Sequence, residues 1–145
     1  MLKKHTFWFK LAIAFQFITG VVHSLSFLNE SKPTNDSEKK LFDLMANYNF
    51  DFGAGFHHSM EDILNSFSLT FSLLLFFSAT INGFLLKSKL PSKTLKGILF
   101  INLITYFICL ITMYLLTFLP PIICIGLIVV CLLMSLLTLQ KEKNL

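Results

Sequence analysis

Four long apolar runs restrict the fold of this chain more than any other feature of its 145 residues. Each run has about 18 to 24 residues, close to the roughly 20 that an α-helix needs to cross a bilayer's hydrocarbon core. Hydrophobic residues make up 54% of the chain and charged residues only 14%, fewer charges than soluble domains carry. The sequence therefore predicts an all-α transmembrane four-helix bundle in a single membrane domain. The predicted spans cover residues 7–28, 61–86, 97–119 and 122–139, each with approximate bounds.

The segment between the first two spans, residues 29–60, is polar and acidic. It is expected to hold a short amphipathic helix near residues 36–48, because Asn35 and Glu38 have the spacing of a capping box. The apolar residues that recur at helical spacing in it are Leu41, Phe42, Leu44, Met45 and Tyr48. We expect this helix to rest on the bundle or in the membrane interface. The run Asp51–Gly55 is expected to end it, because its two glycines favour non-helical backbone angles.

The distribution of lysine predicts the topology. All twelve basic residues are lysines, and the N-terminus, the loop after the second span and the C-terminus hold three, four and two of them. An even number of spans places these segments on one side, which the positive-inside rule makes cytoplasmic. The acidic loop is then extracytoplasmic, and the expected location is the inner membrane of a bacterium. The net charge of +4 is thus explained by topology rather than by nucleic-acid binding.

Polar residues recur along one face of each of the first three spans. These stripes are Gln16, Thr19, His23 and Ser26 in the first span, Asn65, Ser68 and Ser72 in the second, and Asn102, Thr105, Cys109 and Thr112 in the third. They could line a cavity that opens outward, or they could form ordinary hydrogen bonds between helices. The fourth span has few polar residues, so it is expected to face lipid or another subunit.

Ionisable residues gather near the outer ends of the first two spans. In a helical segment, His57 pairs with Glu61 and His58 with Asp62 at i, i+4, so each pair shares a face. Imidazole and carboxylate side chains are ligands of first-row transition metals. The candidate metal ligands are therefore His23, His57, His58, Glu61 and Asp62. The alternative is a solvated helix start whose acidic residues are favoured by the helix dipole.

Two classes of function follow from these patterns. In the first, an outward-facing pocket binds a small lipophilic ligand, or a transition metal or haem cofactor, for a reaction that the sequence does not specify. Its candidate residues are Gln16, His23, His58, Asp62 and Asn65. In the second, the chain is a noncatalytic accessory, immunity-type or partner-binding membrane protein, and its outer helix matters more than its histidines. A transporter is a third option, and it would require a homo-oligomer because a monomer with four spans is small for transport. In every case the spans are expected to contact membrane lipids.

Several short motifs are similar to those of a known group of proteins. The first span ends in Gly20-Val-Val-His23-Ser, and Phe50-Asp-Phe-Gly53 and Ser59-x-x-Asp62 precede the second span. With Leu41, Leu44 and Met45 in the outer helix, this arrangement resembles small bacterial four-span membrane proteins of the DoxX-like type. The likeness covers residues 16–75, and it implies a compact four-helix bundle.

Overall fold

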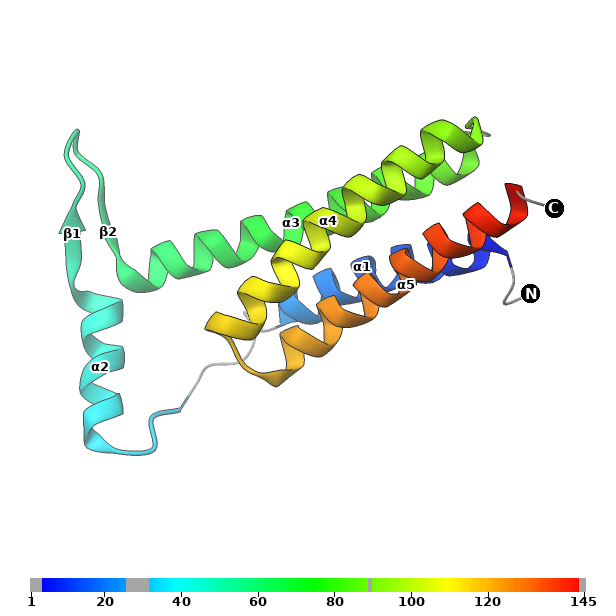
Figure 1. Ribbon diagram of the computed structural model, residues 1–145. Coiled ribbons are helices and arrows are strands. Elements are labelled where there is room, and N and C mark those ends of the chain that lie inside the picture. The colour runs from blue at the N-terminus through cyan, green and yellow to red at the C-terminus, as the bar shows by residue number, and fades with distance from the viewer. Residues whose placement is uncertain (1–3, 26–31, 89, 144–145) are drawn as a thin grey trace. The chain divides into compact units, whose positions relative to one another are not determined.

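The computed structural model describes residues 4–25, 32–88 and 90–143, and helices dominate it (Figure 1). Four of its helices are long and apolar enough to cross a membrane. They are α1 (His5–Leu25), α3 (Met60–Lys87), α4 (Ser92–Leu116) and α5 (Leu119–Lys143). The four predicted apolar helices are therefore confirmed, with bounds that shift by a few residues. The predicted end of the first span at residue 28, and Ser26 with it, lie outside the described residues.

Between α1 and α3 lie a fifth helix and a short β-hairpin. Helix α2 spans Asp36–Asn47, and strands β1 (Asn49–Asp51) and β2 (His57–Ser59) pair in antiparallel fashion. Figure 1 shows β1 following α2 and β2 leading directly into α3. The all-helical prediction did not include this hairpin.

The hairpin turn corrects one expectation about the glycine-containing run. The helix ends earlier, at Asn47, and the run turns the chain between the two strands. Gly53, Ala54 and Gly55 have φ values of 79°, 53° and 84°, in the left-handed region that glycine enters without steric cost. The glycines therefore reverse the chain rather than end the helix.

The chain, expected to be a single membrane domain, divides into two compact units. The first comprises Met1–Thr19 with Leu75–Leu145, and the second comprises Gly20–Leu74. The first unit thus holds α4, α5, most of α1 and the C-terminal part of α3. The second unit holds α2, the hairpin and the remaining turns of α1 and α3.

The core of the first unit is built from one buried stripe on each helix, at the three- and four-residue spacing of a helical face. Its buried apolar residues are Phe9 and Ala12 of α1, Leu75 and Ala79 of α3, Leu95, Leu99 and Tyr106 of α4, and Ile125, Ile128, Val129, Cys131, Leu132, Leu136 and Leu139 of α5. Helix α5 supplies half of them. The fourth span was expected to face lipid or another subunit, and α5 does so on one face only. That face exposes Leu127, Val130 and Leu133, whereas the opposite face packs in the core.

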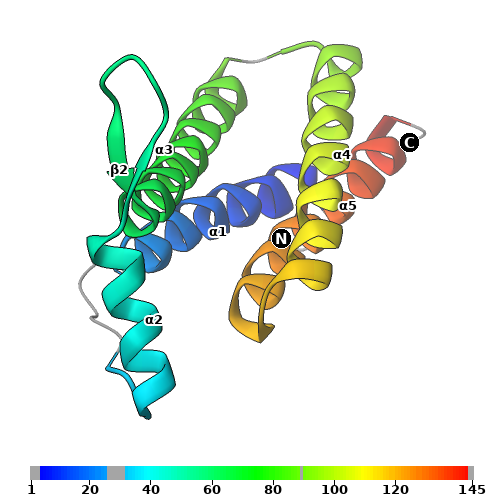
Figure 2. The ribbon, with the colours of Figure 1, turned by 90° about the vertical axis from the view of Figure 1, so that its left-hand side faces the viewer.

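Helices α4 and α5 form an antiparallel pair, because a short connection makes consecutive helices antiparallel neighbours. Only Thr117 and Phe118 join them, and Figure 2 shows the two helices side by side. Pro120 and Pro121 lie within the first turn of α5 rather than in the connection itself. Proline is suited to that turn because the N–H groups there have no partner within the helix.

Candidate functional site

His23 lies in the second unit near the end of α1, where it packs against an aromatic ring. Its imidazole is half-buried, and its ring centroid is 5.1 Å from that of Phe71 at an interplanar angle of 87°. This edge-to-face arrangement is a favourable contact for aromatic rings. The position of His23 is thus explained at least in part by packing.

The two neighbouring histidines lie on a strand and not on a helix. Their register places His58 opposite Phe50 and His57 opposite Asp51, and both imidazoles are exposed. Successive residues of a strand point to opposite faces, so the two histidines do not share one. The predicted helical pairing of the histidines with Glu61 and Asp62 was therefore wrong, although His58 still lies within electrostatic range of Asp62.

The start of α3 explains why the helix does not extend back to the histidines. The Ser59 N–H donates to Asp62 Oδ2 at 3.1 Å, and the Asp62 N–H donates to Ser59 Oγ at 3.1 Å. These reciprocal bonds form a capping box, which fixes the first residue of a helix. Asp62 is engaged in this cap, whereas Glu61 and Asn65 are exposed. The alternative of a solvated helix start describes this segment better than a ligand set does.

The predicted metal ligands do not come together. Among the described residues, no group of three or more histidine, cysteine, aspartate or glutamate side chains is placed to hold a metal ion. The five candidates, His23, His57, His58, Glu61 and Asp62, all belong to the second unit. His58 lies within electrostatic range of Asp62, but these two residues alone do not make a group of three. The histidines of β2 lie before the cap and the acids of α3 lie after it.

Gln16 belongs to the first unit, where it forms a cluster of three amides with Asn82 and Asn102. The Asn82 Nδ2 group donates to Gln16 Oε1 at 3.2 Å and to Asn102 Oδ1 at 2.9 Å. The side chain of Gln16 is fully buried, that of Asn82 is almost fully buried, and that of Asn102 is half-buried. This amide cluster connects α1, α3 and α4 near the centre of the first unit.

Two further hydrogen bonds join the helices of the first unit. The Tyr106 hydroxyl donates to Ser78 Oγ at 2.9 Å, and Ser135 Oγ donates to the His5 carbonyl at 3.0 Å. The first bond connects α4 to α3 and the second connects α5 to α1. Interhelical hydrogen bonds of this kind are common in membrane bundles.

The polar stripe predicted for the third span faces inward only in part. Thr105 and Thr112 are exposed, and their hydroxyls donate to the carbonyls of Ile101 and Ile108 in the preceding turn. A threonine bonded in this way needs no partner from another helix. The interior face of α4 therefore runs instead through Leu95, Leu99 and Tyr106.

The hairpin presents an aromatic face that the sequence analysis missed. We define the aromatic face as Tyr48, Phe50, Phe52, Phe56 and His58, which alternate along the two strands and their ends. Its ring centroids lie 4.9 Å apart for Tyr48 and Phe50, 6.1 Å for Phe50 and Phe52, and 6.4 Å for Phe56 and His58. All of these side chains except Phe50 are exposed. The alternation of aromatic residues at positions 48, 50 and 52 is the sequence signal that predicts a strand here.

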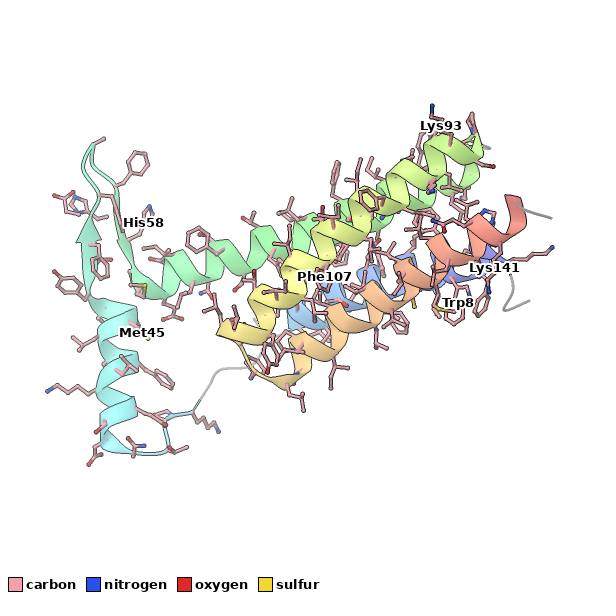
Figure 3. All side chains as sticks on the ribbon, in the orientation of Figure 1. Trp8, Met45, His58, Lys93, Phe107 and Lys141 are labelled. Atoms are coloured by element: carbon pink, nitrogen blue, oxygen red, sulfur yellow. The ribbon has the colours of Figure 1, made fainter. Side chains whose placement is uncertain are left out.

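Helix α2 presents an apolar surface next to the hairpin. None of its residues is buried, and Leu41 and Leu44 are more than half exposed. Met45, on the same helix, is labelled in Figure 3 together with His58 of β2. The second unit thus exposes the kinds of side chain that the first unit buries.

The N-terminus of α2 is capped in a modified form of the expected box. Asn35 Oδ1 accepts from the Glu38 N–H at 2.9 Å, as the spacing predicts. The Glu38 carboxylate binds Thr34 instead of the Asn35 backbone, accepting from the Thr34 N–H at 2.6 Å and from its hydroxyl at 2.7 Å. These bonds, the backbone bond first, hold the pKa of Glu38 below its ordinary value, because they stabilise the ionised carboxylate.

Comparison with known proteins identifies no relative. No family model, no curated protein and no solved structure matches the chain. Its function must therefore be argued from its own residues and geometry.

Proposed function

We propose that the chain is an integral membrane protein of a bacterial inner membrane, with both termini in the cytoplasm and α2 outside. The length and apolarity of four helices support the membrane assignment. Figure 3 shows Lys93 and Lys141 at the same end of the first unit, and the bond from Ser135 to His5 holds the start of α1 next to α5. Lysines gathered at one end of a bundle favour the cytoplasmic side.

Within this arrangement, the protein is a noncatalytic membrane protein that binds another protein through the second unit. The observation that carries the proposal is the exposed aromatic face, in which Phe52 and Phe56 flank a tight turn. Aromatic residues dominate the binding energy of protein interfaces, since they bury a large area with few rotatable bonds. The apolar residues of α2 extend this surface.

The charge of the second unit favours a protein partner over a lipid surface. Residues 32–62 carry six acidic residues against three lysines, a net charge of −3. Anionic headgroups attract basic segments and repel acidic ones. The partner is therefore expected to present apolar pockets for the aromatic face and a basic rim around them.

A photoreactive phenylalanine derivative at position 56 tests this function in native membranes. Irradiation should yield one discrete protein adduct, since Phe56 is 61% exposed. The same derivative at Phe84, which is exposed on α3 in the first unit, serves as the control. Adducts of position 56 with lipid alone would contradict the proposal and identify the second unit as a membrane anchor.

Two substitutions separate partner binding from a role of the histidine. Leu44→Asp places a charge on the exposed surface of α2, and it should lower the adduct yield at least about tenfold, as loss of an interface hot spot does. His23→Ala should leave the yield unchanged. The reverse result, with His23 required and Leu44 dispensable, would return attention to a ligand site at the end of α1.

A further inference from the structure

The amide cluster of Gln16, Asn82 and Asn102 has an unused hydrogen-bond donor. Gln16 Nε2 is buried, and no described residue accepts a hydrogen bond from it. A buried amide nitrogen without an acceptor destabilises a protein, because it has lost its hydrogen bonds to water. Such a group is expected to have an acceptor from outside the chain that completes the cluster.

A flip of the side-chain amides, which exchanges their oxygen and nitrogen atoms, does not supply the missing acceptor. The Nδ2 group of Asn102 donates to the Ile98 carbonyl at 3.0 Å, which leaves its Oδ1 as an acceptor. Asn82 must then direct its Nδ2 toward that oxygen, and the same Nδ2 directs its second hydrogen to Gln16. Gln16 therefore has to present its oxygen to Asn82 and keep its nitrogen for another partner.

The surroundings of this nitrogen specify what the partner can be. The three side chains of the cluster are neutral, so nothing in it compensates a charged ligand. Gln16 lies eleven residues after His5, or about 16 Å along a helix of 21 residues. This depth is near the middle of a hydrocarbon core. A neutral oxygen acceptor on an apolar molecule fits the position.

We propose that the amide cluster is a binding site for the carbonyl oxygen of a lipophilic molecule, held by Gln16 Nε2. The carbonyl belongs to a free lipophile, such as a quinone or ketone, because the ester groups of membrane lipids lie at the edge of the hydrocarbon core and not near its middle. The site is independent of partner binding, because all its residues belong to the first unit. The lipophilic ligand expected from the sequence would thus bind at the amide cluster and not at His23 or His58.

The single tryptophan of the chain provides a reporter for this site. Trp8 precedes Gln16 by eight residues on α1, about 12 Å along the helix. A substituted benzoquinone with a decyl chain quenches tryptophan fluorescence when it binds nearby. Titration of the purified full-length protein in detergent should show saturable quenching, and 2-tridecanone should compete with the quinone where tridecane does not.

Gln16→Met tests the role of the amide, because methionine has a similar size and no hydrogen-bond donor. It should weaken quinone binding about five- to tenfold, the effect of losing one neutral hydrogen bond. Thr80→Val is the matched control, since the exposed Thr80 hydroxyl donates to the Phe76 carbonyl of its own helix. That control should bind the quinone as the unmodified protein does.

A pair of phospholipids tests the assignment to a free lipophile. Failure of both a diester phospholipid and its diether analogue to compete with the quinone would support it. Competition by the diester lipid, but not by the diether, would overturn it. Quenching that never saturates, or that is equal in Gln16→Met, would overturn the proposal. If Gln16→Met does not fold, equal competition by the ketone and the alkane in the unmodified protein would overturn it as well.

Discussion

The first unit buries several polar side chains, whereas α2 and the hairpin of the second unit expose apolar ones. In the first unit, Gln16 and Ser135 are 0% exposed and Asn82 is 2% exposed. In the second, Leu44 is 55% exposed and Phe56 is 61% exposed. The first unit thus buries amide and hydroxyl groups, which are costly to place in hydrocarbon. The second unit exposes leucine and phenylalanine side chains, which are costly to place in water.

This contrast indicates different environments and different roles. A unit surrounded by lipid gains little from hiding apolar surface, because lipid tails are as apolar as leucine. It must instead satisfy its polar groups internally. In the proposed arrangement only α2 and the hairpin of the second unit lie outside the membrane, since its parts of α1 and α3 belong to candidate spans. Aromatic rings exposed there resemble a binding surface before its partner arrives. The predictions below test each side of this comparison, and the largest expected effect comes first.

The largest effect is expected from a pair of neighbouring leucines on α5. Leu132 is 0% exposed and Leu133 is 42% exposed, so the two differ in burial and not in chemistry. Leu132→Ala should lower the free energy of unfolding by about 2 kcal/mol or more, because it opens a cavity in the core. Leu133→Ala should have an effect below about 0.5 kcal/mol. Reversible unfolding in mixed micelles measures both, and equal effects would show that α5 is not the core of the first unit.

The next effect concerns Asn82, which connects the two other amides. Asn82→Leu removes two hydrogen bonds and leaves the oxygens of Gln16 and Asn102 without their donor. The expected loss of stability is about 1–3 kcal/mol. Thr80→Val, two residues earlier, should cost much less, since that hydroxyl bonds within its own helix. A neutral Asn82→Leu would mean that the first unit does not depend on internal polar satisfaction.

The sequence predicted the four apolar helices for a simple physical reason. A run of about 20 apolar residues is required to cross a bilayer, and few other folds use such runs. It also identified the inward position of Gln16 and Thr19, both of which are buried. Sequence alone could not say which polar residues of α4 face inward, because a threonine such as Thr105 can satisfy its hydroxyl within its own helix.

The second unit was harder to predict because its elements are short. Strands of three residues, such as His57–Ser59, give periodicity too little length to distinguish them from the start of a helix. The predicted pairing of His57 with Glu61 assumed a helix that begins before Ser59. The sequence shows the motif Ser59-x-x-Asp62. It does not show whether a helix capped at Ser59 is more stable than one that begins before it. The cap thus leaves the histidines on a strand and the acids on a helix.

A smaller effect is expected from that cap. Ser59→Ala removes the hydroxyl that accepts from the Asp62 N–H, and it should destabilise the start of α3 by about 1 kcal/mol. Hydrogen exchange of the amides at Met60–Ile63 should become faster. Ser66→Ala is the control, because the exposed Ser66 hydroxyl donates only to the Ile63 carbonyl. If exchange is unchanged in Ser59→Ala, the cap does not fix where the second unit joins α3.

The smallest effect should appear as a change with pH at the N-terminus of α2. The Glu38 carboxylate accepts two hydrogen bonds from Thr34, and its pKa is lower in the folded state than in the unfolded chain. A lowered pKa contributes stability above the unfolded value, which is about 4.3 for glutamate, and that stability is lost as the pH falls through the folded value. The protection factors of the Thr34 and Glu38 amides, which are corrected for the intrinsic effect of pH on exchange, should therefore fall below about pH 4. Glu38→Gln should abolish this pH dependence while the Asn35 cap remains, and an unchanged profile would show that another group controls the helix start. Because Glu142, near the C-terminal end of α5, is the single acidic residue of the first unit, the protection of the α4 amides should not change over this range. The comparison between the units would then extend to their response to acid.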